Sequence, residues 1–190
     1  CLIWYKNRIM DRQNFIKKSG AGISYALFSG LVFCKNQDDE VGALNYNDLK
    51  IIRDADGEVF NVIGDKQTHK LLGSETNDQI FEWVDNVEPG VSIPPHIHTK
   101  EDEIFRVVEG EVEIAIDGES TVLKAGDIAF APKGVPHTWK VVGTQKAKMI
   151  TSALPAGIEI MFQELSELPA GPPDFKKVAE ICAKQGISFV

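Results

Sequence analysis

The stretch Pro95-His96-Ile97-His98-Thr99-Lys100-Glu101-Asp102-Glu103 decides what this chain is expected to be. Its two histidines are two residues apart, and on an extended strand such side chains project to the same face. The carboxylate of Glu103 follows where the chain enters the β-rich run 104–108. Two imidazoles and one carboxylate make three metal ligands, one fewer than a closed tetrahedral site uses. If His137 returns to the same face, three of the four histidines in the chain converge on one point.

The composition is that of a soluble globular protein. With 190 residues, of which 43% are hydrophobic and 25% charged, the chain can form one domain with terminal extensions. The net charge of -8 argues against a nucleic-acid-binding surface and against binding to an anionic membrane. Cys1, Cys34 and Cys182 lie far apart and form no CxxC pair, so neither a zinc ribbon nor a disulfide framework is predicted.

Residues 1–40 have the layout of an export leader followed by a linker. Met10 is interpreted as the start of the natural protein, with residues 1–9 as upstream sequence. After it, three basic residues precede the apolar run 21–33: Arg12, Lys17 and Lys18. We therefore expect an exported protein, periplasmic or lipid-anchored. The alternative is an amphipathic or loosely packed N-terminal helix on a cytoplasmic protein.

Cys34 is the candidate for an N-terminal lipid anchor. It follows the apolar run and precedes the acidic, linker-like segment 35–40, as in a lipoprotein cleavage site. Phe33 stands where such sites usually carry a small residue. Gln13 likewise stands where a twin-arginine export motif has its second arginine.

Residues 41–168 are predicted to form an all-β domain. Short apolar runs alternate with turns rich in glycine and proline, a pattern typical of a β-sandwich or barrel. The Asp117-Gly118 pair is a strong hairpin signal. The expected strands are 59–64, 68–73, 79–87, 92–98, 104–108, 112–116, 120–123, 128–131, 137–142, 146–153 and 158–165. The Pro94-Pro95 pair removes two hydrogen-bond donors, which suits a sheet edge or a bulge.

Residues 169–190 are predicted to be a helical extension. The segment 169–173 reads as a linker, and Asp174 can cap a helix that runs to about Gln185 and stops at Gly186. One side of this helix is apolar and should pack on the barrel: Phe175, Val178, Ala179, Ile181 and Cys182. Cys182 is accordingly interpreted as a small buried residue, not as a reactive thiol.

Two longer patterns can be written through the ligand candidates. They are Gly90-x5-His96-x-His98-x4-Glu103-x6-Gly110 and Gly126-x5-Pro132-x-Gly134-x2-His137. Both match the signature motifs of the cupin family, and the chain resembles that family. The resemblance implies an all-β double-stranded β-helix, or jelly-roll barrel, with one divalent metal bound by His96, His98, Glu103 and His137. Val141 departs from the family pattern, since many members carry asparagine at that position.

The donor set agrees with a catalytic metal. Three imidazoles and one carboxylate leave two positions of an octahedral ion open for water, substrate or dioxygen. Nitrogen and oxygen ligands suit Mn, Fe, Co, Ni, Cu or Zn, so the sequence does not select the ion. A single histidine would favour an ordinary surface or core role, but three with a glutamate at this spacing favour a metal site. His69 lies outside both motifs and is predicted to be an ordinary surface histidine.

Phe105 and Trp139 are the candidate walls of a substrate pocket. Phe105 is two residues from Glu103 and Trp139 is two residues from His137, so each shares a face with a ligand candidate. The alternative for both aromatic side chains is plain core packing.

A finer resemblance concerns function. The runs 64–76, 94–103, 155–162 and 172–187 are similar to small bacterial cupins related to quercetin 2,3-dioxygenase. This resemblance implies a metal-dependent dioxygenase for a flavonol or another small enol or phenol, with Glu103 as both ligand and base. The partners would then be a small-molecule substrate, dioxygen and, in a homodimer, a second copy. The alternatives are a non-redox cupin, such as an isomerase or lyase, and a cupin that binds a small ligand without catalysis.

Overall fold

The computed structural model describes residues 50–190 of the chain. The predicted export leader, the lipid anchor at Cys34 and the linker up to residue 40 lie outside these residues. Within the described range β-strands predominate, and no helix there is long and apolar enough to cross a membrane.

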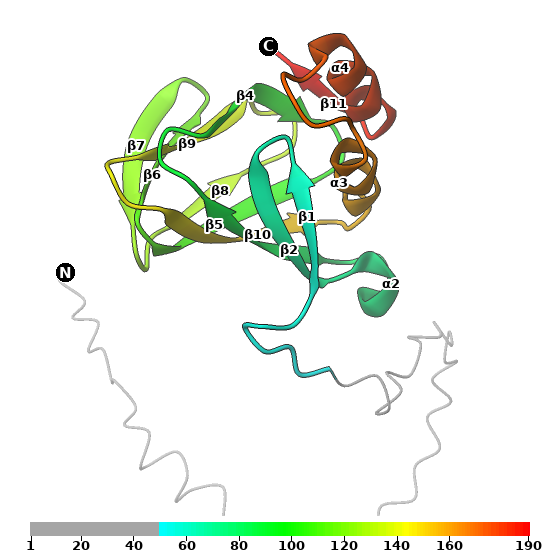
Figure 1. Cartoon of the computed structure of the whole chain (residues 1–190), viewed down its shortest axis with the longest axis horizontal. Helices are drawn as coiled ribbons and strands as arrows, with labels where there is room; N and C mark the ends of the chain where they lie inside the picture. The colour runs from blue at the N-terminus through cyan, green and yellow to red at the C-terminus, as the bar shows by residue number, and fades with distance from the viewer. Residues whose placement is uncertain (1–49) are drawn as a thin grey trace, which may run out of the picture. The chain divides into compact units, whose positions relative to one another are not determined.

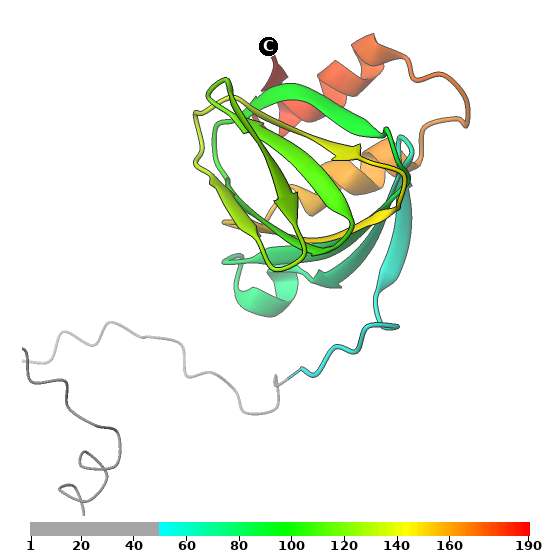
Figure 2. The same ribbon diagram turned by 90° about the vertical axis from the view of Figure 1, so that its left-hand side faces the viewer.

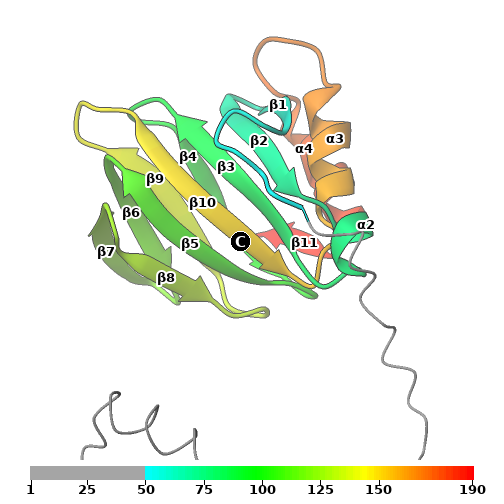
Figure 3. The same ribbon diagram turned by 90° about the horizontal axis from the view of Figure 1, so that it is seen from below.

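The strands form two antiparallel sheets that face each other, as seen in Figure 1 and, from other sides, in Figure 2 and Figure 3. The six-stranded sheet has the order β1 (Glu58–Val62), β2 (Asp65–Leu71), β3 (Phe81–Val87), β10 (Ala147–Leu154), β5 (Asp102–Glu109) and β8 (Ile128–Ala131). The five-stranded sheet has the order β11 (Ile187–Phe189), β4 (Ser92–His98), β9 (His137–Val142), β6 (Glu111–Ile116) and β7 (Glu119–Lys124). This arrangement confirms the predicted all-β jelly-roll class.

The interior contains two hydrophobic clusters. One lies between the sheets and takes side chains from both, among them Val107 and Met149 from the first sheet and Val112 and Val141 from the second. The other packs the six-stranded sheet against the C-terminal elements. Strand β10 shows how the sequence produces this, because its residues alternate between buried and partly exposed along the whole strand.

Residues 158–165 do not form the predicted strand. They belong to helix α3 (Glu159–Ser166), which packs near β1 and against helix α4 (Phe175–Lys184) in Figure 1. Its N-cap residue Ile158 and its buried residues Met161 and Leu165 are three and four positions apart, which is the period of a helix and not of a strand. A second short helix, α2 (Gly73–Thr76), begins at the last residue of a predicted strand.

The predicted C-terminal helix is confirmed as α4. The side chain of Asp174 accepts hydrogen bonds from the backbone N–H groups of Lys176 and Lys177, which makes it the N-cap. Val178, Ile181 and Cys182 are buried on the packed side. The prediction was wrong for Phe175 and Ala179, which are exposed.

Strand β11 was not predicted. It pairs antiparallel with β4, with Ile187 opposite His98 and Phe189 opposite His96. The C-terminal segment therefore supports the strand that carries two of the ligand candidates. On the other side of β4, the pairing with β9 shifts register between Ile93 and His96, so the Pro94-Pro95 pair sits at a bulge as its chemistry indicated.

Candidate metal centre

His96 and His98 are presented by one strand. Both lie on β4, both are buried, and the intervening Ile97 is less buried because it points to the other face. The rings lie close together, with centroids 5.0 Å apart. Alternation along β4 thus places the two imidazoles side by side, as the spacing predicted.

Glu103 and His137 come from opposite sheets. Glu103 lies near the start of β5, and His137 is the first residue of β9, where it pairs with His96. The loop 132–134 holds His137 in place, since the backbone N–H of Gly134 donates to the carbonyl of His98 at 2.7 Å. The backbone N–H of Lys133 also donates to the carboxylate of Asp102 at 2.9 Å. The loop is thereby tied to both segments that carry the other ligand candidates.

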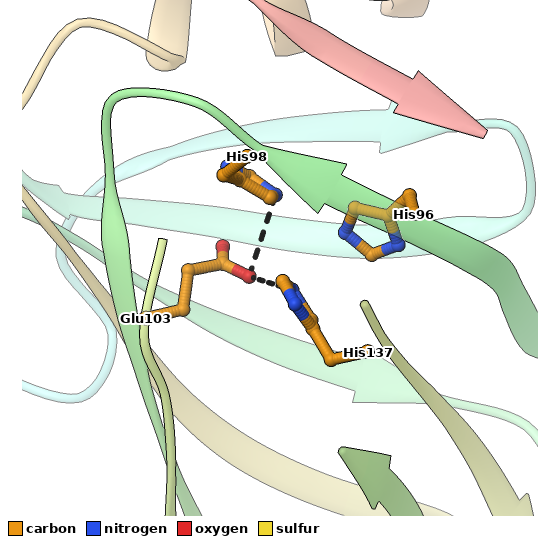
Figure 4. Close-up of side chains that lie close together, drawn as sticks. All are labelled: His96, His98, Glu103 and His137. Carbon is orange, nitrogen blue, oxygen red and sulfur yellow. Dashed lines mark hydrogen bonds and ion pairs between the residues drawn. The ribbon is translucent and has the colours of Figure 1, made fainter. Parts of the chain in front are cut away.

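The four side chains converge on one point, as Figure 4 shows. One ligating atom from each of His96, His98, Glu103 and His137 lies within 4.8 Å of the others. Oε2 of Glu103 is 2.9 Å from Nε2 of His137 and 3.6 Å from Nε2 of His98. All four residues are buried, so an ion between them is shielded from bulk water.

The rings are oriented by acceptors outside the cluster. Nδ1 of His96 is 2.9 Å from the carbonyl oxygen of Pro94, and Nδ1 of His137 is 3.0 Å from that of Val135. A carbonyl oxygen only accepts, so in both rings Nδ1 carries a proton and Nε2 is the nitrogen that faces the cluster. Such outer hydrogen bonds are the usual support of metal-binding histidines.

Glu101 gives His98 the same support, and the sequence analysis missed it. Its carboxylate is buried, and Oε2 lies 3.4 Å from Nδ1 of His98. The available signal was the spacing, since an acidic residue three positions after the second histidine of the pair can reach back to it. The motif spacing drew attention to Glu103 alone.

The electrostatics favour the metal-binding protonation state at His96 and Glu103 and the protonated ring at His137. Burial lowers the pKa of His96 to about 4, although the charge of Glu103 acts in the opposite direction. Burial works to raise the pKa of Glu103, but the hydrogen bond from His137 and the neighbouring imidazoles outweigh it, and this pKa is lowered. For His137 burial is outweighed by the bond to Glu103, which raises its pKa. His96 is therefore neutral and Glu103 ionised at neutral pH, as metal ligands must be.

These residues fit a divalent transition metal. The set combines three imidazole nitrogens with one carboxylate oxygen, the chemistry preferred by the ions from Mn to Zn. The Nε2 lone pair of His96 is free for coordination, and Nε2 of His137 can coordinate once it gives up the proton that it donates to Glu103. Four protein donors leave positions open on a six-coordinate ion. The cluster can thus hold a metal of the catalytic type, whose identity the donor set leaves undetermined.

A large cavity adjoins the cluster. Its volume is about 730 Å³, and His96, His98 and Glu103 form part of its wall. Phe105 and Trp139, the predicted pocket walls, both line it. Most of the remaining wall is apolar and includes side chains from α3, from β11 and from α4, of which only α4 was expected to pack on the barrel. A cavity of this volume is in the range that holds a drug-sized organic molecule.

His69 contradicts its prediction as a surface histidine. It is 3% exposed and packs between Phe60 and Phe81, with ring centroids 4.4 and 4.8 Å away. Burial lowers its pKa to about 4, so the ring is neutral in the folded protein. It lies on β2, opposite Trp83, and is no member of the metal cluster. The sequence carried no local sign of this, because the burial comes from neighbouring strands and α3.

Cys182 is buried, as predicted. It faces the cavity from α4, and burial raises the pKa of its thiol to about 11. The thiol is therefore protonated at neutral pH and is a poor nucleophile.

Comparison with known proteins defines the class. Residues 83–153 match the family described as the cupin domain. This range begins within β3, ends within β10 and contains all four clustered side chains. These residues form a cupin domain, in agreement with the two sequence motifs and with the fold.

The curated relatives include two kinds of oxidoreductase. Over 93 residues the chain is 33% identical to oxalate oxidase GF-2.8 of Triticum aestivum, and the alignment covers 45% of this chain and 42% of that protein. Over 92 residues it is 28% identical to quercetin 2,3-dioxygenase of Bacillus subtilis (strain 168), and the alignment covers 48% of this chain and 27% of that protein. The chain thus spans less than half the length of these relatives.

Solved structures agree on the fold alone. A predicted oxalate decarboxylase from Thermotoga maritima is 21% identical, with a TM-score of 0.52 over 56% of this chain and 99% of that chain. KdgF from a Halomonas species is 19% identical, with a TM-score of 0.51 over 58% of this chain and 97% of that chain.

Proposed function

We propose that this cupin domain is a metal-dependent dioxygenase that acts on a small, mostly apolar enol or phenol, such as a flavonol. The observation that carries the proposal is the position of the metal cluster in the wall of a large and mainly apolar cavity. The curated relatives include oxalate oxidases and a quercetin 2,3-dioxygenase, all of them oxidoreductases. The cavity favours the larger and less polar of these substrates.

The volume and the apolar wall of the cavity favour a substrate larger than oxalate. Oxalate is a small dianion that would leave most of a cavity of about 730 Å³ unfilled, with its charges against apolar walls. A multi-ring phenol can fill the space and replace water along Phe105 and Trp139. Burial of the ring system then provides affinity, and the polar end of the substrate faces the cluster.

The residues of the cluster have separate tasks. A divalent metal held by His96, His98, Glu103 and His137 would supply a Lewis acid for the substrate oxygen and, if redox-active, electron transfer to dioxygen. Glu103 is ionised and buried, so it can accept the proton of a substrate hydroxyl at Oε1 or Oε2. Phe105 and Trp139 hold the ring plane and exclude water.

The proposal is tested by metal analysis and oxygen consumption. Protein purified without chelator should contain a divalent metal, and the reconstituted protein should consume oxygen with a flavonol or a catechol. Glu103→Ala and His98→Ala should abolish this activity, whereas Lys100→Ala, at an exposed position between them, should keep it. Oxygen consumption that is unchanged in the first two variants would refute the mechanism.

The same experiment separates the alternatives. Turnover of a substrate in the absence of oxygen would support a non-redox isomerase or lyase that uses the metal as a Lewis acid. Stoichiometric binding with no product under either condition would support a binding protein.

A further inference from the structure

A second polar group lines the same cavity away from the metal cluster. Asp65 and Gln67 on β2 and Asp85 on β3 all contribute to the wall. Both aspartates are 1% exposed, although carboxylates are rarely buried without a partner. The residues around them in the cavity wall, such as Val62 and Trp83, are mainly apolar.

The aspartates are too far from the cluster to be ligands of the same ion. Asp85 pairs with Met149 of β10, whereas Glu103 pairs with Ala153 of that strand. Asp85 and Glu103 are thus two strands and four residues apart, a separation of about 17 Å between Cα atoms in a regular sheet. The cavity therefore has two polar regions joined by apolar wall.

The two carboxyl groups differ in what they bind. Asp85 is fully engaged, because Oδ1 accepts from the indole N–H of Trp83 and Oδ2 from the hydroxyl of Thr151, both at 2.6 Å. Asp65 is engaged on one side only, where Oδ2 accepts from the amide of Gln67 at 2.8 Å. Oδ1 of Asp65 is buried, and apart from the neighbouring carboxyl group of Asp85 no group of residues 50–190 donates a hydrogen bond to it. Buried polar atoms of this kind are rare in native proteins, and they often belong to a binding or catalytic site.

Asp65 and Asp85 also influence each other's protonation. The two carboxyl groups lie within hydrogen-bonding reach of each other. Burial raises the pKa of both groups, and the charge of Asp65 raises that of Asp85 further. The pKa of Asp85 is raised the further of the two, so Asp85 holds its proton more firmly and the negative charge of the pair rests on Asp65. Such a pair can accept a hydrogen bond from a hydroxyl group without binding a cation.

We propose that Oδ1 of Asp65, held by Gln67 and backed by Asp85, binds a hydroxyl group of the substrate at the end remote from the metal cluster. The inference rests on the proposed function, because it takes the cluster as the site of the reacting end. It narrows the substrate class to elongated, mostly apolar molecules with a polar group at each end. A phenol with a second hydroxyl on a distant ring has this form.

The test compares ligands that differ by one hydroxyl. Kaempferol carries a hydroxyl on the pendant ring of the flavonol and galangin lacks it, whereas naphthol and naphthalene form a pair without an enol. The full chain is loaded with zinc, which binds such ligands without redox chemistry, so that affinity is measured without turnover. Quenching of Trp83 and Trp139, which both line the cavity, reports binding.

The wild-type protein should bind kaempferol roughly tenfold more tightly than galangin, the effect of one buried hydrogen bond to a charged group. Asp65→Ala should reduce this ratio to nearly one, and Asp65→Asn, which keeps the shape, should give an intermediate ratio. Leu165→Ala removes apolar wall and should weaken both flavonols alike, leaving the ratio unchanged. If Asp65→Ala does not fold, the kaempferol-to-galangin affinity ratios of the wild-type protein and of Asp65→Asn decide whether Asp65 binds the hydroxyl group.

The outcomes separate this inference from the proposed function. Equal binding within both pairs, no binding of any of the four compounds, or full discrimination in folded Asp65 variants overturns the role of Asp65. Oxygen consumption that depends on Glu103 would still support the dioxygenase in those cases. Discrimination between naphthol and naphthalene that is lost in Asp65→Ala, without flavonol binding, would support Asp65 and reject flavonols as the substrate class.

Discussion

Nε2 of His137 lies 2.9 Å from Oε2 of Glu103, although the two residues are 34 positions apart and belong to opposite sheets. The contact exists only when the sheets are closed on each other. Metal binding and closure of the sandwich are therefore coupled, because an ion that binds both residues favours the folded state.

Removing His137 should uncouple metal binding from stability. In the wild-type protein, divalent metal at about 100 times its dissociation constant should raise the free energy of unfolding by about 2.7 kcal/mol. His137→Ala leaves three donors and should lose most of this gain, because the affinity for the ion falls. Thermal unfolding with and without metal, together with the bound metal content, measures both quantities. An undiminished metal-dependent shift in His137→Ala would place the ion elsewhere.

Glu101 should matter to metal affinity although it is no ligand candidate. Glu101→Gln weakens the acceptor that orients Nδ1 of His98, and a loss of about 10- to 100-fold in metal affinity is expected. Glu109→Gln is the matched control, since this carboxylate is exposed further along the same segment. Competition with a coloured chelator measures the affinity, and equal values for the two variants would contradict the role of Glu101.

The buried His69 should make stability depend on pH. Its pKa is 6.5 when unperturbed and is lowered to about 4 by burial. Above pH 6.5 the ring is neutral in both the folded and the unfolded protein, so it does not change the free energy of unfolding. As the pH falls from 6.5 towards 4, the unfolded chain takes up a proton that the folded chain does not, and the free energy of unfolding decreases by about 3 kcal/mol. Urea unfolding of the wild-type protein and of His69→Phe should be compared across this pH range. The free energy of unfolding should fall less steeply with decreasing pH in the variant.

Gly110 and Gly118 form a matched pair for backbone strain. Their φ angles are 79° and 82°, a region that L-residues with a Cβ disfavour. A Cβ at Gly110 would lie 2.5 Å from the carbonyl oxygen of Lys146, whereas one at Gly118 would meet open space. Gly118→Ala should cost about 1 kcal/mol, and Gly110→Ala about 2 kcal/mol or more, because a steric clash adds to the strain. Urea titration compares the two, and equal costs would contradict the clash.

The strands and the metal motifs were predictable because their signals are local. The two-residue spacing of His96 and His98 already places both rings on one face, and the Asp117-Gly118 turn is readable from the dipeptide. The approach of His137 is not local, and the sequence indicated it only through resemblance to a family.

What the sequence failed to predict depends on tertiary contacts. The run 158–165 is short and apolar, and its helical period became decisive only once the buried side was known. Burial of His69 requires Phe60 and Phe81 from adjacent strands. The contact between Asp65 and Asp85 joins two strands, β2 and β3. The only feature of the sequence that indicated it was an aspartate on the inward face of β3.

The pairing of β11 with β4 has a consequence for synthesis of the protein. A ribosome makes His98 several seconds before it makes Ile187, which later pairs with it. During that interval β4 has an open edge in the nascent chain, which other strands can join. The Pro94-Pro95 pair lacks backbone N–H groups, so it also protects the growing polypeptide from aggregation until its own partner strand emerges.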